Sequence, residues 1–314
     1  MRRGAEIAAS RKNGAGRHRG YIFDYRPRAK TLALLDDVRA VMNEYRGYWP
    51  LTCRQVFYRL VSTTALYPKT ELFYGKLCHH LANARRGRAI QFGAIRDDGL
   101  TTCSLDHFDN HEHFLRHVRE LGKNYTRNKL ARQEVHIEVW CEAAGMLPQL
   151  HAVAEPYSIP VYSSGGFDSL TAKKRLADRI CKLGKPAIIL HLGDFDPSGV
   201  SIFDSVAEDV AAFVEADRPW ATVSVAFERV ALTAEQVRQY DLPTAPPKAS
   251  DTRSKSWQGG TCQLEALPPD VIADILRATI NRHFDLEGLH HDLRQEETDR
   301  RRIAGALPVP GGAS

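Results

Sequence analysis

The pattern of apolar and polar positions changes near residue 134. From there to about residue 232, apolar runs of strand length alternate with longer stretches whose apolar residues recur at helical spacing. This β-α-β-α-β-α-β order predicts a mainly parallel sheet with right-handed crossovers, and in such sheets ligands bind at the carboxyl ends of the strands. The expected strands cover 134–140, 159–163, 186–192 and 222–232, and the expected helices cover 143–153, 169–183 and 198–214.

Helical spacing predominates upstream of this region. It predicts a helix over 32–45, a second helix over 53–62 with Thr52 as its N-cap, and a third helix from Thr70 to about residue 84. Two short helices that are joined tightly and followed by the extended stretch 89–95 favour a winged helix-turn-helix. A helical hairpin that does not touch DNA is the alternative interpretation, since such hairpins are common.

The last part of the chain is expected to contain a connector and two helices. Residues 243–260 are rich in Pro, Ser and Gly without periodicity, and helical spacing returns over 269–283 and on to about residue 302. The expected protein is therefore of the α/β class and has four parts. They are a basic flexible leader (1–30), a winged-helix domain (31–130), a domain with a Rossmann-like, mainly parallel sheet (131–242), and a linker with C-terminal helices that complete the sheet domain (243–314).

Composition favours a soluble globular protein. The 314 residues are 43% hydrophobic and 26% charged, which leaves room for two domains with cores of useful size. No apolar run approaches the ~18 residues that a membrane span needs, so we expect no membrane partner. The six cysteines are scattered without a CxxC pair, which favours reduced thiols in the cytoplasm over a zinc ribbon or a disulfide framework.

Positive charge is concentrated at the N-terminus. Residues 1–30 contain nine Lys and Arg against two acidic residues, whereas the net charge of the whole chain is only +5. A leader of this composition suits a flexible arm that binds a polyanion such as DNA or RNA without sequence preference. A solvated tail that merely keeps the protein soluble is the alternative.

Three acidic residues follow two of the expected strands. Glu142 follows the first strand, and Asp194 and Asp196 follow the third. We expect alternation to point the two aspartates the same way and the parallel sheet to bring Glu142 beside them. Three carboxylates would repel one another unless a cation neutralised them, and an all-oxygen set suits Mg²⁺ or Mn²⁺. The His-rich stretch 105–118 is instead interpreted as a surface helix without a metal site.

The DxDPxG run after an apolar strand, combined with a Glu at the end of an earlier strand, resembles the Toprim domain of topoisomerases, primases and related nucleases. In that family the strand-terminal Glu and the later DxD hold a divalent metal. The resemblance therefore implies that Glu142, Asp194 and Asp196 are metal ligands. The family's Glu is usually followed by Lys, whereas Ala143 stands here.

Residues nearer the N-terminus narrow the resemblance. The segment 54–59 is similar to the Arg-x-Ile-Tyr-Tyr motif in the winged-helix domain of two proteins, the DNA-cleaving subunit of topoisomerase VI and the meiotic double-strand-break protein. Tyr58 occupies the position of the DNA-cleaving nucleophile, and Phe57 replaces the first tyrosine. Arg54 lies one helical turn before Tyr58, so it is the best candidate to assist the attack. Packing of Tyr58 within its helix is the alternative interpretation.

The order of winged helix and Toprim covers roughly residues 30–235 and is similar to the short, stand-alone relatives of this cleaving subunit in bacteria, phages and mobile elements. Residues 263–267 resemble a late Glu-Leu-Asp-Ala-Leu segment of that family with both acids altered. The resemblance implies double-stranded DNA as a partner and a homodimer in which the tyrosine and the acidic cluster of one active site come from different subunits. The candidate DNA contacts are Arg59, Arg85, Arg86 and Arg88.

The expected function is that of an enzyme like the cleaving subunit of type IIB topoisomerases, cytoplasmic and associated with the nucleoid. In it, Tyr58 attacks a DNA phosphodiester with help from a Toprim-bound Mg²⁺ or Mn²⁺. The chain contains no GxxxxGK[ST] loop, so ATP-driven strand passage would need a separate ATPase partner. One alternative is a Toprim nuclease that uses water and in which Tyr58 only packs. The other is a DNA-binding subunit without catalytic activity.

Overall fold

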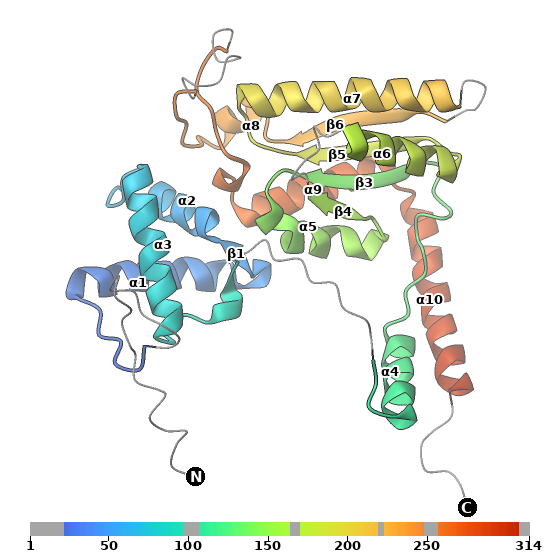
Figure 1. Ribbon diagram of the computed structural model, residues 1–314, viewed down its shortest axis with the longest axis horizontal. Coiled ribbons are helices and arrows are strands. Elements are labelled where there is room, and N and C mark those ends of the chain that lie inside the picture. The colour runs from blue at the N-terminus through green and yellow to red at the C-terminus, as the bar shows by residue number, and fades with distance from the viewer. Residues whose placement is uncertain (1–21, 97–106, 164–169, 219–222, 248–256, 308–314) are drawn as a thin grey trace, which may run out of the picture.

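The structure, a computed structural model, describes residues 22–96, 107–163, 170–218, 223–247 and 257–307, so most of the basic leader lies outside the described residues. Its centre is a sheet in the order β4-β3-β5-β6, and all neighbouring strands in it are parallel (Figure 1). The strands are β3 (His136–Cys141), β4 (Val161–Ser163), β5 (Ala187–Leu192) and β6 (Val225–Ala231). The predicted α/β class and parallel sheet are therefore confirmed.

Helices cover both faces of this sheet because successive side chains of a strand point to opposite sides. On one face, Ile189 of β5 packs into an apolar cluster with α6 and α7. On the other face, Leu190 and Leu192 pack into a second cluster with α5 and α9. These helices are α5 (Leu147–Ala154), α6 (Leu170–Leu183), α7 (Pro197–Asp217) and α9 (Pro269–His283). All four were expected from helical spacing.

Three further helices form an N-terminal lobe beside the sheet (Figure 1). They are α1 (Ala29–Glu44), α2 (Cys53–Thr63) and α3 (Glu71–Arg86), which the sequence also predicts. Two short strands, β1 (Leu51–Thr52) and β2 (Ile95–Arg96), pair in parallel within this lobe. The extended stretch expected over 89–95 is a strand only at its end, because Phe92–Ala94 forms a 3-10 turn.

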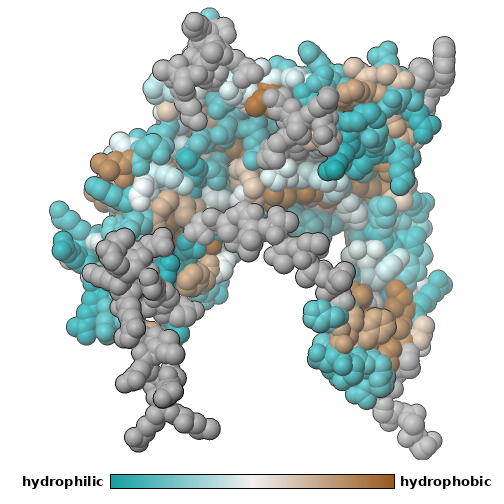
Figure 2. Space-filling view, in the orientation of Figure 1, coloured by the Kyte–Doolittle hydropathy of each residue, from teal (hydrophilic) through white to brown (hydrophobic). Residues whose placement is uncertain are grey.

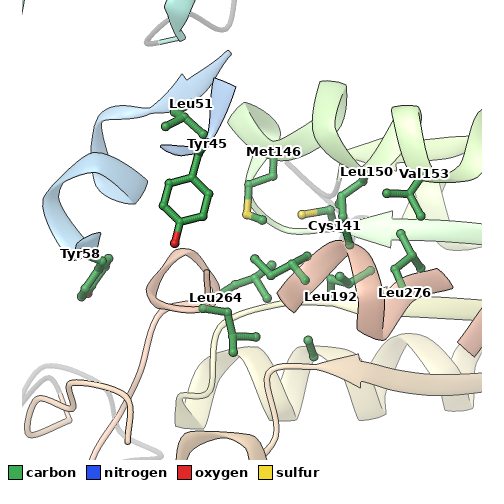
Figure 3. Packing of buried hydrophobic residues seen from close by; sticks show 14 of the residues in the cluster. Tyr45, Leu51, Tyr58, Cys141, Met146, Leu150, Val153, Leu192, Leu264 and Leu276 are labelled. Carbon is green, nitrogen blue, oxygen red and sulfur yellow. The ribbon is translucent and has the colours of Figure 1, made fainter. Parts of the chain in front are cut away.

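One apolar core runs from the N-terminal lobe into the sheet. Val38 of α1 and Leu60 of α2 belong to the same buried cluster as Met146, Leu150 and Leu192, part of which is drawn in Figure 3. Burial of each large apolar side chain stabilises the fold by roughly 1.5–3 kcal/mol. The domain boundary expected between residues 130 and 131 therefore does not separate two cores.

A pair of helices projects from the sheet as a leg (Figure 1). α4 (His111–Lys123) packs against α10 (Leu286–Ala306), although the sequence assigned it to the N-terminal domain. α4 has no buried residue, and its apolar side chains Phe114 and Leu121 are 46% and 57% exposed. Figure 2 shows an apolar area on the surface of this helix pair. Residues 111–118 of the His-rich stretch thus lie on a surface helix, as expected, whereas His107 precedes that helix.

Two further features complete the fold. α8 (Ala234–Gln239) follows β6 and was not expected, because six residues are too few to reveal a helical period. Within the described ranges, no helix combines the length and the apolarity that crossing a membrane requires.

Thr52 fixes the start of α2 and also reaches a distant part of the chain. Its hydroxyl accepts a hydrogen bond from Gln55 N–H at 3.1 Å, and the Gln55 side chain accepts one from Thr52 N–H at 2.9 Å, which together form a capping box. The same hydroxyl donates a hydrogen bond to the buried carboxylate of Glu265. One side chain therefore caps α2 and partners a buried acid.

We expect Thr52→Ala to lower the free energy of unfolding by about 2–3 kcal/mol, because it removes a cap and leaves the Glu265 carboxyl without this donor. Thr233→Ala is the matched control, since Thr233 and Gln236 form the same capping box on α8 and no long-range side-chain hydrogen bond of Thr233 is present among the described residues. It should cost about 1 kcal/mol. Urea titrations measure both values, and equal losses would contradict a special role for the contact with Glu265.

Candidate functional site

The two aspartates lie just beyond the end of β5, where the chain leaves the sheet. Asp194 Oδ1 accepts a hydrogen bond from Leu264 N–H at 2.9 Å. Asp196 caps α7, and its Oδ1 accepts a hydrogen bond from Gly199 N–H at 2.7 Å. β5 ends at Leu192, so strand alternation does not orient these two side chains; each is held by a different backbone N–H, and both line the same pocket.

Glu142 lies beside them, as the parallel sheet predicts. Its Oε2 accepts a hydrogen bond from Asp194 N–H at 3.2 Å. Its Oε1 is buried and has no hydrogen-bond partner among the described residues, although His191 Nε2 is 3.6 Å away. A Cβ on Gly193 would lie 2.6 Å from the Glu142 carboxyl carbon, so any larger residue at position 193 would displace the Glu142 carboxyl.

Burial and mutual repulsion act on this acidic group. Burial is the main cause that raises the pKa of Glu142 and of Asp194 above their ordinary values, and the neighbouring aspartates add to it. Arg229 opposes both shifts, and its guanidinium donates hydrogen bonds to the Leu232 carbonyl at 3.0 Å and to the Asp194 carbonyl. Arg229 was not identified from the sequence, because nothing in its strand pattern distinguishes it.

The acidic group offers a partial fit to a divalent metal. A Cβ on Gly199 would lie 3.2 Å from Asp196 Oδ1 and 3.4 Å from Glu142 Oε1, so oxygens of both residues flank the space that this glycine leaves. Oxygen donors of this kind suit Mg²⁺ or Mn²⁺. However, the described residues contain no group of three or more His, Cys, Asp or Glu side chains arranged to hold a metal ion. The three-carboxylate metal site thus stays a prediction.

The tyrosine singled out by the sequence lies near this group. Tyr58 and Arg54 are one turn apart on α2, and both donate hydrogen bonds to Gln263 Oε1, at 2.8 Å from the hydroxyl and 2.7 Å from the guanidinium. Tyr58 is only 4% exposed, and burial raises its pKa well above the ordinary value, with Arg54 opposing the rise. The hydroxyl is therefore protonated at neutral pH. Phe57 packs between aromatic rings of α3, where a hydroxyl has no evident role.

One pocket joins these parts. It has a volume of about 360 Å³, and its lining includes Tyr58, Lys69, Asp194, Asp196 and Gln263. The resemblance implies that the tyrosine and the acids of one site come from different subunits, whereas in this structure a single chain brings them together. Glu142 does not line the pocket and lies behind the aspartates.

Residues 262–267, called the joining segment below, bring Gln263 to this pocket. Cys262 forms an antiparallel bridge with Phe195, and Leu264 N–H binds Asp194, so the chain folds back onto the end of β5 after the connector. The role of Gln263 was missed because nothing in the local pattern marks it. The only indication was the resemblance of residues 263–267 to a late segment of the family.

Two of the four predicted DNA contacts are corrected by the structure. Arg59 is buried, and its guanidinium donates a hydrogen bond to the Ala266 carbonyl in the joining segment. Arg85 is also buried, with its guanidinium 5.6 Å from the centroid of the Phe92 ring. Neither side chain is available on the surface. Arg88 is exposed and Arg86 partly exposed, so DNA contact by these two stays a prediction.

Comparisons of the chain with protein-family models, with curated proteins and with solved structures found no match.

We expect Glu142→Gln to stabilise the folded protein at neutral pH without divalent metal. A raised pKa means that the folded chain binds the proton more tightly than the unfolded chain, so the wild type loses stability as the pH rises from about 4 through the raised value. The amide has no charge to desolvate, and its oxygen can keep the hydrogen bond from Asp194. The free energy of unfolding at pH 7 should therefore be higher for Glu142→Gln than for the wild type.

Urea titrations at about pH 7 and about pH 3 measure this gain, which should vanish at the lower pH because the wild-type carboxyl is then neutral in both states. Glu208→Gln, on the exposed side of α7, is the control for the loss of one negative charge. A Glu142→Gln protein no more stable than the wild type at pH 7 would show that the acidic group is not under electrostatic strain.

Proposed function

We propose that this protein is a DNA-cleaving and rejoining enzyme of the same kind as the cleaving subunit of type IIB topoisomerases. One observation carries the proposal: Tyr58, held with Arg54 by Gln263, lines the same pocket as Asp194 and Asp196. The two sequence motifs that carry the resemblance are far apart in the chain. Residues of both motifs line one pocket, as they must if they belong to one active site.

The fold is compatible with the domains that this proposal implies. A parallel sheet with an acid after β3 and two acids after β5 supports a Toprim domain. Two short helices, α2 and α3, with the tyrosine on the first of them support a winged-helix domain. We therefore propose both identities together with the activity.

In the proposed reaction, Tyr58 Oη forms a bond to the phosphorus of a DNA phosphodiester, and the bond from that phosphorus to one deoxyribose oxygen breaks. The tyrosine loses a proton and the departing sugar oxygen gains one, so the net proton count does not change. One phosphodiester replaces another, which allows the strand to be resealed by the reverse reaction. Arg54, one turn from Tyr58, is placed to stabilise negative charge on the phosphate.

A divalent metal would be held by Asp196 and Glu142, whose side-chain oxygens flank Gly199, and the neighbouring Asp194 would add negative charge beside it. When bound, Mg²⁺ or Mn²⁺ neutralises charge on the phosphate and the leaving oxygen. The unpartnered Oε1 of Glu142 and the raised pKa of the buried Glu142 and Asp194 carboxyls support a cation at this place. Asp194→Ala or Asp196→Ala should accordingly abolish cleavage.

Tyr58→Phe should abolish covalent attachment of the protein to DNA, lowering it by about 1,000-fold or more, because only the attacking oxygen is removed. The measurement is to incubate supercoiled plasmid with protein and Mg²⁺, denature the reaction, and quantify protein that stays on the DNA ends. Tyr125→Phe, between α4 and β3, is the control for loss of a tyrosine hydroxyl. Attachment that persists in Tyr58→Phe would contradict the proposed nucleophile.

A Toprim nuclease that uses water is the second candidate. It is favoured by the burial of Tyr58 and the hydrogen bond from its hydroxyl to Gln263, which suit a packing role. The same assay separates the two, since water would give cut DNA without attached protein, and Tyr58→Phe would still cut. A DNA-binding subunit without catalytic activity would bind the plasmid and leave it intact.

Because one chain supplies the tyrosine and both aspartates, we expect the site to act within a single chain. Mixing Tyr58→Phe chains with Asp194→Ala chains should then leave covalent attachment at the background of either variant alone. A mixture of wild-type and Tyr58→Phe chains shows how much signal half the active sites give. Recovery of attachment in the mixture of the two variants would show instead that a homodimer divides its sites between subunits.

A further inference from the structure

Lys69 is the basic residue of the pocket that the sequence did not single out. It lies in the connection between α2 and α3, and its Nζ is 5.7 Å from the centroid of the Tyr58 ring. The pocket that it lines also contains Asp194 and Asp196. Its ammonium group therefore faces the same space as the proposed nucleophile.

Two arginines near this pocket, Arg54 and Arg229, form hydrogen bonds within the protein. Arg54 donates to Gln263 and lies over the Tyr74 ring, with 4.6 Å from its guanidinium carbon to the ring centroid. Arg229 donates to the carbonyls of Leu232 and Asp194. Lys69, by contrast, forms no ion pair with any carboxylate of the described residues, although Glu71, Asp194 and Asp196 line the pocket with it.

None of the acidic residues that line the pocket, Glu71 included, is close enough to Lys69 to form an ion pair with it. Its side chain is partly buried, and burial lowers the pKa of the ammonium group. Cys262 opposes this lowering of the Lys69 pKa, but burial raises the pKa of that thiol to about 11, so the thiol is neutral at physiological pH. An ammonium group that is partly withdrawn from water without an anion is costly, and an anionic ligand would offset that cost.

The chemistry of the pocket limits what this anion can be. A carboxylate ligand would be repelled by Asp194 and Asp196 and would offer no atom for Tyr58 to attack. A phosphodiester has anionic oxygens that a cation can bind and a phosphorus atom that the Tyr58 hydroxyl can attack. Lysine is a point charge that binds phosphate without demanding one fixed geometry. Thr70, the N-cap of α3, and its neighbour Lys69 line the pocket on the side of the N-terminal lobe.

We propose that Lys69 binds a non-bridging oxygen of the DNA phosphate that Tyr58 attacks. This inference rests on the proposed function and adds to it the residue that positions the scissile phosphate. Lys69 then contacts the phosphate from the N-terminal lobe, and a metal held by the acidic group would contact it from the side of the sheet. The carboxylates of the pocket alone would repel the phosphate, and the lysine offsets this repulsion before any metal is bound.

The first experiment measures DNA binding without cleavage. In a Tyr58→Phe background, affinity for a short fluorescein-labelled DNA duplex is measured by anisotropy over a range of KCl concentrations. Lys69→Gln should weaken binding by about 3- to 10-fold and lower the slope of log K against log [salt] by about 0.9, the value for one phosphate contact. Lys69→Arg keeps the charge and should restore most of the affinity.

Lys182→Gln is the matched control. Lys182 is an exposed lysine in the last turn of α6, which ends shortly before the start of β5 and therefore far from the carboxyl end of that strand. Its loss removes the same charge far from the pocket and should change the slope little. Thermal melting of all variants checks the fold, which substitution of the partly exposed Lys69 should leave intact.

The second experiment tests whether the phosphate that Lys69 contacts is the one that Tyr58 attacks, by measuring the rate of covalent attachment. With Tyr58 intact and DNA saturating, Lys69→Gln should lower the rate of covalent attachment by at least tenfold, whereas Lys182→Gln should leave it unchanged. A lysine that only contacts DNA away from the site would lower affinity without changing this rate, which would overturn the proposal.

The remaining outcomes separate the two proposals. Equal effects of Lys69→Gln and Lys182→Gln on binding would overturn the role of Lys69 while leaving tyrosine cleavage intact. Specific loss of binding in Lys69→Gln, together with no covalent attachment by the wild type, would overturn cleavage and keep Lys69 as a phosphate-binding residue. Failure of the wild-type protein to bind DNA at all would overturn both.

Discussion

The joining segment, residues 262–267, connects the N-terminal lobe to the sheet. It forms hydrogen bonds with both of them. On the side of the sheet, Cys262 pairs with Phe195 and Leu264 N–H binds Asp194. On the side of α2, the segment accepts hydrogen bonds from Thr52, Arg54, Tyr58 and Arg59. The position of Tyr58 relative to Asp194 and Asp196 therefore depends on the joining segment, which contains none of these three residues.

The pocket holds charges of both signs in a partly dehydrated setting. Burial raises the pKa of Asp194 and lowers that of Lys69, so each group is destabilised in its charged form. The protein offsets part of this cost with backbone hydrogen bonds to the acids and with Arg229 beside them. The part of the desolvation cost that the protein does not offset can be offset by a bound ligand. The same charged groups that are unfavourable in the empty pocket therefore favour binding of a ligand.

The sequence predicted the elements well because their signals are local. The spacing of apolar residues identified α1 to α3, the four strands and both C-terminal helices, and Thr52 was identified as an N-cap from its position alone. The placement of α4 against α10 and the burial of Arg59 were not predictable in this way. Each depends on contacts between residues far apart in the chain, and a charged side chain gives no local indication that a distant carbonyl will bury it.

Separation along the chain also explains which residues of the site the sequence identified and which it did not. Glu142, Asp194 and Asp196 could be grouped because parallel strands end at one edge of a sheet. Gln263, Lys69 and Arg229 could not, because their roles arise only when the joining segment folds back. The long reach of these contacts also sets an order of events during synthesis. Arg59 of α2 and Thr52, its N-cap, bind Ala266 and Glu265, more than 200 residues later in the chain. These contacts of the N-terminal lobe can therefore form only after the ribosome has released that part of the chain.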